Sequence, residues 1–366
     1  MTRHRTRISF FGSSLLSSYW NGAATYYRGI IRAMHALGYD VTFFEPIAYG
    51  RQERRDLAER PDWATIHVYS GDEDGVAKAL EAAQSADWII KASGVGIFDD
   101  LLEKEVLRVG KHGAGTIFWD VDAPATLDRV RGNSDDPFCD LIPKYDMILT
   151  YGGGEPVVRA YLELGARACV PIYNALDPST HFPAAPDPSF DAALSFLGNR
   201  LPDREERVEE FFLKPAASLR ELTFLLAGSG WGGKPMSQNV RYLDHLSTSQ
   251  HNIFNSSARA ILNVTRNSMA KYGFSPATRI FEAAGAGACI ISDYWEGIDL
   301  FLEPDREILV GRSGDEVTNI LRALSVSAAA RIGAAALKRV RSEHTYSQRA
   351  AQVHSILAGR NVAAAM

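Results

Sequence analysis

The feature that most constrains this chain is a repeated alternation of short apolar runs with longer stretches of helical periodicity. In the first half, the apolar runs Ile8–Phe11, Thr116–Trp119 and Met147–Thr150 are separated by helical patterns such as Ala24–Leu37. Strand followed by helix, repeated along a chain, is typical of a parallel sheet covered by helices. We therefore expect a doubly wound α/β domain in this half.

A proline-rich segment interrupts the alternation, which then starts again. Five of the sixteen prolines lie between Pro171 and Pro188, where fixed φ angles and missing N–H donors disfavour a helix or a central strand. Apolar runs resume at Ala193–Leu197, and the residues after Gly314 are rich in Ala, Leu and Arg at helical spacing. A chain of 366 residues also exceeds what one hydrophobic core usually serves. The sequence thus predicts two doubly wound domains at 1–173 and 191–345, a linker at 174–190, and a C-terminal helix and tail at 346–366.

Charge, cysteine content and hydropathy exclude several classes of protein. The 39 Lys and Arg residues against 44 Asp and Glu residues give a net charge of −5, which does not favour nucleic acid as a partner. The three cysteines, Cys139, Cys169 and Cys289, are far apart and outside any C-x-x-C pattern, so we expect a reducing, cytoplasmic setting. The longest run of small and apolar residues, Ala283–Ile291, is far shorter than the roughly 20 residues of a membrane-spanning helix, so we expect no transmembrane segment.

The stretch around residues 272–296 carries the strongest indication of a ligand. Ser275 is a good helix cap and Pro276 suits a first helical turn, so a helix is predicted to begin here. The backbone N–H groups of Ala277 and Thr278 would then point outward from the partially positive helix end. Such an end favours an anion, for which a phosphate group is well suited.

Two charged residues of the same predicted helix extend this interpretation. Arg279 in the first turn opposes the helix dipole, unless a negative group such as a diphosphate lies beside it. Glu282, three residues further on, could accept hydrogen bonds from both hydroxyls of a ribose. The spacing is equally typical of a solvated ion pair between Arg279 and Glu282.

Two loops of the second half contain further candidates. Arg200 follows an apolar run that ends in glycine, and it could equally pair on the surface with Asp203 or Glu205. Gly228 opens the pattern G-x-x-x-x-G-K, but Pro235 stands where a phosphate-binding loop needs Ser or Thr. We therefore interpret these glycines as a loop that lets a nucleobase approach the backbone. Phe254 and Asn255 are weaker candidates beside a base, and core packing of Phe254 is the simpler interpretation.

The first half offers candidates for contact with a second substrate. Trp20, Asn21 and Gly22 lie between the first strand and its helix, where an aromatic ring and an amide suit a sugar or another acceptor. A plain helix-entry turn explains them equally well. Asp120 and Asp122 leave a strand end on the same side because strand side chains alternate. They could form a D-x-D metal pair, supply a general base with Asp122 as the better placed, or cap a turn.

Three segments resemble one family. The stretch GFSPATRIFEAAGAGACIISDYWEGIDLFLEPDREILV resembles the nucleotide-binding half of GT-B glycosyltransferases, especially the CgeB-like, spore-maturation type group. NALDPSTHFP, Asn174 to Pro183, resembles the linker of large retaining GT-B families, and residues 10–46 resemble their N-terminal opening. Many retaining members carry two glutamates eight positions apart. Glu282 matches the second, but Phe274 stands at the position of the first, so the stereochemical outcome stays open.

This resemblance implies a fold, a reaction and a site. The fold is GT-B, with two Rossmann-like domains that face a cleft, and Arg200 lies beside the donor diphosphate. The reaction is metal-independent transfer of a sugar from a nucleoside diphosphate sugar to an acceptor hydroxyl, with no cofactor beyond the donor. We expect the second domain to bind the nucleotide and the first to bind a sugar or glycoconjugate acceptor. The alternatives are a nucleotide-sugar epimerase on the same fold and a non-enzymatic protein that binds sugar nucleotides.

Overall fold

Residues 5–19, 21–57, 61–111 and 113–363 are described in the computed structural model of this chain. They divide into two compact units. The first contains residues up to Tyr173 together with the segment from Tyr346 onward, and the second runs from Asn174 to Thr345. The segment 174–190, expected to be a linker, belongs to the second unit, and the C-terminal helix belongs to the first.

The first unit is built on a seven-stranded parallel sheet of order β3-β2-β1-β4-β5-β6-β7. Its strands are β1 (Arg7–Phe11), β2 (Asp40–Pro46), β3 (Thr65–Tyr69), β4 (Trp88–Ala92), β5 (Gly115–Asp120), β6 (Met147–Thr150) and β7 (Cys169–Pro171). Its connecting helices are α1 (Ala24–Ala36), α2 (Glu73–Ala83), α3 (Asp99–Gly110), α4 (Ala123–Gly132) and α5 (Gly154–Glu163). All five residues of β4 are buried, as expected for a central strand covered on both faces.

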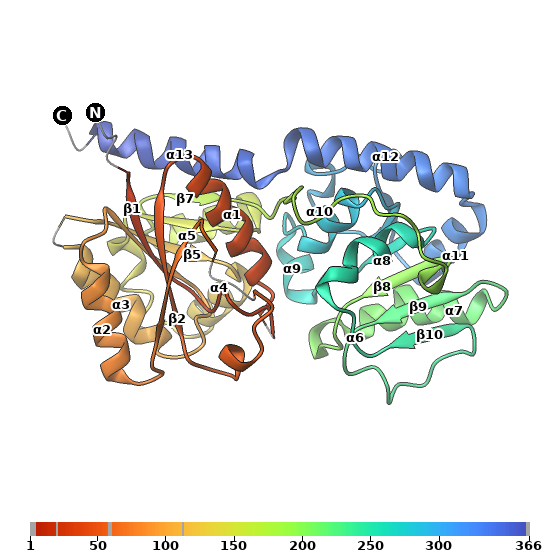
Figure 1. The fold of residues 1–366 in the computed structure, drawn as a ribbon, viewed down its shortest axis with the longest axis horizontal. Helices are drawn as coiled ribbons and strands as arrows, with labels where there is room; N and C mark the ends of the chain where they lie inside the picture. Colours follow the sequence, from red (N-terminus) through yellow and green to blue (C-terminus); the bar gives the residue numbers. More distant parts are fainter. Residues whose placement is uncertain (1–4, 20, 58–60, 112, 364–366) are drawn as a thin grey trace. The chain divides into compact units, whose positions relative to one another are not determined.

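Helix α13 (Tyr346–Ala363) returns to this first unit and packs against α1, as Figure 1 shows. The contact depends on one glycine, because a Cβ on Gly29 would lie 2.2 Å from the ring of Tyr346. The Tyr346 ring also lies edge-on to Tyr26, 6.0 Å between centroids. The last helix of the chain therefore completes the core of the first unit.

The second unit is built on a six-stranded parallel sheet of order β10-β9-β8-β11-β12-β13. Its strands are β8 (Leu194–Leu197), β9 (Phe224–Ala227), β10 (Val240–Leu243), β11 (Ile261–Asn263), β12 (Ile290–Asp293) and β13 (Leu309–Gly311). Its helices are α6 (Pro202–Val208), a π-helical turn (Glu209–Leu213), α7 (Lys214–Ser218), α8 (His251–Ser257), α9 (Asn267–Tyr272), α10 (Thr278–Gly285), α11 (Gly314–Ala323) and α12 (Val326–Glu343). Buried apolar residues of β8, β9 and β11 form its core with the helices.

The two parallel sheets with flanking helices confirm the predicted doubly wound fold. The predicted helical C-terminal stretch is confirmed, and it consists of three helices because helix α11 ends before Leu324 and helix α12 ends before His344. Phe254 and Asn255 lie inside α8, and Phe254 is fully buried, which agrees with the simpler interpretation of core packing. The sequence did not indicate strand β10, because it lies at the edge of the sheet and none of its residues is fully buried.

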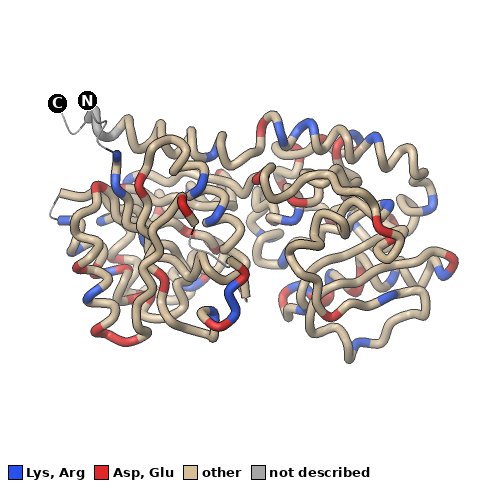
Figure 2. Tube along the Cα trace, viewed as in Figure 1, with Lys and Arg blue, Asp and Glu red and all other residues tan. Residues whose placement is uncertain are grey.

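The charged residues and the hydropathy of the helices can be examined in both units. Figure 2 shows basic and acidic residues interspersed in both units rather than separated by sign. Within the described ranges, no single helix is long and apolar enough to span a bilayer. Helices α11 and α12 reach that threshold only as a pair that bends by 110°.

Candidate functional site

The second sheet has its topological switch point between the neighbouring strands β8 and β11. From β8 the following strands are added towards one edge of the sheet, and from β11 they are added towards the other edge. Ligands of open α/β sheets bind at the carboxyl ends of the strands at such a point. The loop after β8 contains Gly198, and its surroundings are crowded with cations. A Cβ on Gly198 would lie 2.9 Å from the Nη2 atoms of both Arg204 and Arg279.

Arg204 and Arg279 differ from the neighbouring arginines because, among the described residues, neither forms an ion pair with a carboxylate. Arg204 Nη2 donates to the carbonyl oxygen of Asn199 at 2.5 Å, and Arg279 Nε donates to that of Leu197 at 2.8 Å. Their guanidinium carbons lie 5.5 and 5.1 Å from the centroid of the Phe196 ring. Among the described residues, neither has a carboxylate within ion-pair distance, and Arg204 Nε is buried without a hydrogen-bond partner.

The other arginines at this end of the sheet are paired. Arg200 forms a bidentate pair with Glu205 at 2.7 and 2.8 Å, Arg207 pairs with the fully buried Asp293, and Arg266 pairs with Asp203. By contrast, burial lowers the pKa of Arg204, and the nearby positive charge of Arg279 lowers it further. Burial also lowers the pKa of Arg279. Two adjacent cations that are partly desolvated and have no counter-ion are the arrangement that an anion would stabilise.

The loop that contains Gly228 packs against this same place. Gly228 has φ +129°, and a Cβ there would lie 2.4 Å from the carbonyl oxygen of Gly198. The indole Nε1 of Trp231 donates to that oxygen at 2.8 Å. The absence of a side chain at Gly228 thus allows the backbone of Gly198 to approach, rather than the nucleobase that was expected from the sequence. Lys234 forms ion pairs with Glu205 and Glu209, and Pro235 follows without a helix, so no phosphate-binding loop of the G-x-x-x-x-G-K type is formed.

The start of α10 differs from the sequence expectation. The helix begins at Thr278, with Ala277 as N-cap residue, two positions later than predicted. Ser275 does not cap it, because its hydroxyl donates to the carbonyl oxygen of Gly273 at 2.9 Å. The carbonyl oxygen of Pro276 instead accepts a hydrogen bond from Asn174 Nδ2 at 3.1 Å. The outward N–H groups at this helix end therefore belong to Thr278 and Arg279 rather than to Ala277 and Thr278.

The turn before α10 is held in a conformation that non-glycine residues seldom adopt. Phe274 has φ +47°, in the left-handed region, and its N–H donates to the carbonyl oxygen of Glu296 at 2.6 Å. A Cβ on Gly297 would lie 2.2 Å from the Phe274 ring, so that ring needs a glycine beside it. Backbone strain of this kind is often found at ligand sites.

Glu282 is not paired with Arg279. Its carboxylate lies 3.8 Å from Nε2 of His181, and the ligand atoms of His181, His251 and Glu282 all lie within 4.8 Å of one another. The His181 and Glu282 side chains are 12% and 20% exposed, so both remain accessible to a ligand. Burial lowers the pKa of His251, against the opposing charge of Glu282. The ion pair that sequence spacing allowed between Arg279 and Glu282 does not form among the described contacts.

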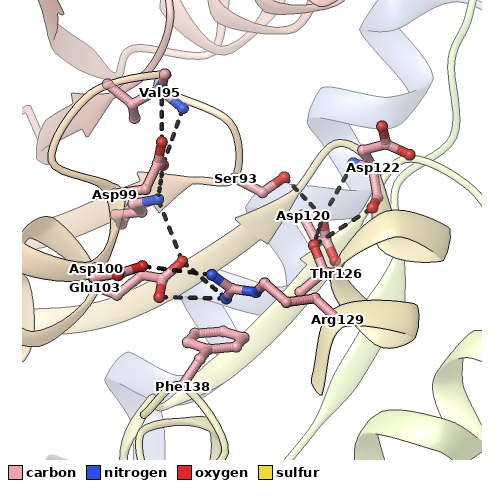
Figure 3. A network of polar contacts seen from close by, with 12 residues as sticks. Ser93, Val95, Asp99, Asp100, Glu103, Asp120, Asp122, Thr126, Arg129 and Phe138 are labelled. Carbon is pink, nitrogen blue, oxygen red and sulfur yellow. Dashed lines mark hydrogen bonds and ion pairs between the residues drawn. The ribbon is translucent and has the colours of Figure 1, made fainter. Parts of the chain in front are cut away.

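In the first unit, Asp120 at the end of β5 is fully buried. Figure 3 shows its position in a network of polar contacts. Its carboxylate accepts hydrogen bonds from Ser93 Oγ at 2.7 Å, Tyr161 Oη at 2.5 Å, Thr126 Oγ1 at 3.1 Å and the backbone N–H of Asp122 at 3.0 Å. Burial raises the pKa of Asp120. A carboxylate enclosed in this way links β5 to the loop after β4 and to helices α4 and α5. Asp120 is thus a structural residue, which corrects the expectation that it acts on a substrate or metal.

Asp122 has a different environment. It is the N-cap residue of α4, but its carboxylate accepts no hydrogen bond from the described N–H groups in the first turn of that helix. The side chain is only partly buried, and Figure 3 shows its carboxylate directed away from Asp120. The two aspartates therefore do not form a D-x-D metal pair, and Asp122 alone stays a candidate base.

The switch point of the first sheet lies between β1 and β4, and two buried charges organise its loops. Lys91 on β4 is fully buried, and its Nζ bonds Asp99 Oδ1 at 2.5 Å. Asp99 also accepts the N–H groups of Val95 and Gly96, which fixes the loop after β4. The guanidinium of Arg51 donates to the carbonyl oxygens of Ser13 at 3.3 Å and Val95 at 3.4 Å, and so bridges the loops after β1 and β4.

Trp20, Asn21 and Gly22 were expected to contact an acceptor, and the structure gives a different result for each. Asn21 is 7% exposed and is used within its own loop, bonding Ser13 Oγ and the carbonyl oxygens of Ser14 and Ser17. It is thus a structural residue of the loop, which corrects the prediction. Gly22 is exposed, and no atom of the described residues lies within 4 Å of the position that a Cβ would take. Trp20 lies outside the described residues.

Residues 204–355 match a family model described as glycosyl transferase-like. No match was found among curated protein sequences. Among solved structures, HepE of Anabaena in complex with UDP and glucose aligns with a TM-score of 0.68 at 12% identity, covering 97% of this chain and 100% of that one. Sucrose-phosphate synthase of Thermosynechococcus elongatus aligns at 0.65 and 14%, covering 99% and 100%. An α-glucosyltransferase in complex with UDP-glucose and DNA aligns at 0.69 and 12%, covering 97% and 100%.

The fold is that of GT-B glycosyltransferases. The family match over residues 204–355 also confirms the expected class of enzyme, a glycosyltransferase. The expected exclusion of nucleic acid does not follow from the fold, since one similar structure was determined with DNA.

Sequence reasoning missed three residues of the second unit that these contacts bring forward. Arg204 gave a usable signal, because it lies four positions before Val208 on the buried face of α6, where a charged residue is unusual. His181 and His251 gave none, because they are 70 positions apart and meet only through folding.

Proposed function

We propose that this chain transfers a sugar from a nucleoside diphosphate sugar to an acceptor hydroxyl, with the donor diphosphate bound beside Gly198 between Arg204 and Arg279. The observation that carries this proposal is the pair of guanidinium groups at the β8/β11 switch point, which have no carboxylate partner among the described residues. A guanidinium offers several N–H donors in a fixed plane and can bind two phosphate oxygens at once. The first N–H groups of α10 add a partial positive charge on the same side.

These groups also suit the chemistry of the transfer. When the bond between the sugar and the diphosphate breaks, negative charge grows on the departing diphosphate. Cations already in place stabilise that charge without reorganisation, which lowers the barrier. We therefore propose metal-independent transfer with no cofactor beyond the donor. We also propose that the acceptor is a sugar or glycoconjugate rather than a nucleic acid.

The remaining donor contacts are assigned from the surroundings of the arginines. Glu282 lies one turn after Arg279 and is partly exposed, so its carboxylate can accept ribose hydroxyls. Arg200 and Gly228 flank the same loop, and Arg200 would have to leave Glu205 to reach a phosphate. Ser275, Pro276 and Ala277 would shape the turn before α10 rather than bind through a cap.

On the acceptor side, Asp122 is the proposed general base. It lies just after β5, at the carboxyl end of that strand, where a ligand of a parallel sheet is expected, and its side chain is only partly buried. Gly22 leaves open space near the loop after β1. This assignment corresponds to inversion, whereas retention would use a donor phosphate oxygen as base.

We also propose a subfamily and a cellular location. The stretch from Gly273 to Val310 supports the CgeB-like group within the GT-B superfamily. All three cysteines, each in the described part of the chain, are free thiols, which supports a reducing, cytoplasmic location.

A thermal-shift panel with UDP, GDP and dTDP tests the donor site. A ligand at 100 times its Kd stabilises the protein by about 2.7 kcal/mol, so the matching nucleotide should stand out. Arg279→Gln should abolish that shift, whereas Arg220→Gln, an exposed arginine of the same unit, should retain it. Absence of a shift with every nucleotide would contradict the proposal. Binding without transfer to any acceptor would favour the non-enzymatic alternative.

A further inference from the structure

Three potential metal ligands from separate segments meet in the second unit. His181 lies in the segment before β8, His251 is the first residue of α8, and Glu282 lies on α10. Their ligand atoms all lie within 4.8 Å of one another. We propose that His181, His251 and Glu282 bind a transition-metal dication, with Zn²⁺ as the best-matched ion.

The donor set and its spacing match this ion. Two imidazole nitrogens and one carboxylate oxygen form a zinc donor set that leaves a fourth position for water. Bonds of about 2.0–2.1 Å in a tetrahedral arrangement place ligand atoms about 3.3 Å apart. His181 Nε2 and Glu282 Oε1 are already 3.8 Å apart, so small side-chain rotations would complete the site.

Outer hydrogen bonds orient His181 for this role. Thr180 Oγ1 donates to the carbonyl oxygen of Asp177 at 3.2 Å, so its lone pair accepts from His181 Nδ1 at 3.0 Å. That assignment leaves the lone pair of Nε2 facing the carboxylate of Glu282. In this tautomer, a cation between the two acceptors would satisfy both of them. A hydrogen bond on the second ring nitrogen is the usual support of a metal-bound histidine.

The other two ligands are also held and accessible. The ring of His251 bonds the backbone of Leu246, which limits its rotation. The carboxylate of Glu282 is partly exposed, and the nearby Arg279 is directed to the carbonyl oxygen of Leu197 rather than to Glu282. An ion can therefore reach the cluster without first displacing a salt bridge.

The proposed function gives this site a consequence, which rests on that function. Glu282 is also the residue proposed to accept the ribose hydroxyls. A metal ion bound to its carboxylate would occupy those acceptor positions, so metal and nucleotide should exclude each other. The metal would thus inhibit donor binding and take no part in the transfer.

Titration of tag-free protein with Co²⁺ tests the site directly. The protein is stripped with EDTA, dialysed and titrated while visible absorption reports tetrahedral coordination, and Zn²⁺ is then added to displace Co²⁺. We expect one equivalent to bind. His181→Ala, His251→Ala and Glu282→Gln should each weaken binding by more than the about 10–100-fold that loss of an outer partner costs. His245→Ala, an exposed histidine of the same unit, should bind as the unchanged protein does.

The outcomes separate this proposal from the proposed function. No Co²⁺ or Zn²⁺ binding, or binding that all three variants retain, overturns the metal site. UDP affinity measured by calorimetry with and without Zn²⁺ then tests the exclusion. A nucleotide that binds equally well with the metal bound overturns the antagonism, whereas a metal site without any nucleotide binding overturns only the proposed function. Circular dichroism of each variant checks that it is folded.

Discussion

Replacing Arg204 by Met should leave the stability of the ligand-free protein nearly unchanged and weaken nucleotide binding strongly. The Nη2 atoms of Arg204 and Arg279 both lie 2.9 Å from the position of a Gly198 Cβ. The two charges are therefore within about 6 Å of each other, and at an effective dielectric constant of about 20 their repulsion is about 2.8 kcal/mol. Removing one of them relieves that repulsion.

The loss of one hydrogen bond opposes this gain. Arg204 Nη2 donates to the carbonyl oxygen of Asn199 at 2.5 Å, and a hydrogen bond to a charged group contributes about 1.5–3 kcal/mol. Met retains apolar volume over the Phe196 ring, so little packing is lost. The two effects nearly cancel, and we expect a change of no more than about 1 kcal/mol in the free energy of unfolding. Loss of the phosphate contact should weaken nucleotide binding by about 10–150-fold.

Urea denaturation of the ligand-free protein and calorimetry with a nucleoside diphosphate measure the two quantities. Arg207→Met is the matched control, because Arg207 lies one turn further along α6 and neutralises the fully buried Asp293. Removing that partner should cost about 3–5 kcal/mol. If Arg204→Met costs as much as this control while nucleotide affinity is unchanged, Arg204 is a structural residue and the reasoning is refuted.

Four further predictions follow from the site and its surroundings. Glu282→Ala should weaken nucleoside diphosphate binding by about 1.5–3 kcal/mol in calorimetry, and unchanged affinity would remove Glu282 from the donor site. EDTA should leave the transfer rate nearly intact, and a loss that Mn²⁺ restores would contradict metal independence. Asp122→Asn should lower turnover by about 10²–10⁴-fold with donor affinity unchanged, and near-normal turnover with retained anomeric configuration would exclude Asp122 as the base. Partial burial opposes ionisation of Asp56, but hydrogen bonds from Arg28 and Ser18 lower its pKa to about 2. Its contribution to the free energy of unfolding is therefore complete above the unfolded pKa of about 4 and is lost as pH falls towards 2. Acid unfolding of Asp56→Asn should lack that part of the pH dependence, and an unaltered profile would contradict the pairing.

The repeated apolar runs were sufficient to predict the two parallel sheets. Runs such as Ile8–Phe11 and Met147–Thr150 are buried in the structure because central parallel strands are covered on both faces. The proline cluster from Pro171 onward also indicated where the first sheet ends, since proline excludes regular structure locally. These properties depend on residues close together in the chain, so they can be read from the sequence.

The roles of the polar site residues depend on partners far away in the chain. Asp120 is enclosed by Ser93, 27 positions earlier, and by Tyr161, 41 positions later, so alternation along its own strand could not indicate its burial. Arg200 and Arg204 are four positions apart, yet Arg200 pairs with Glu205 while Arg204 faces Arg279. Whether a charge is paired, buried or left to bind a ligand is decided by the electrostatic environment that distant segments create, and that environment exists only when the chain is folded.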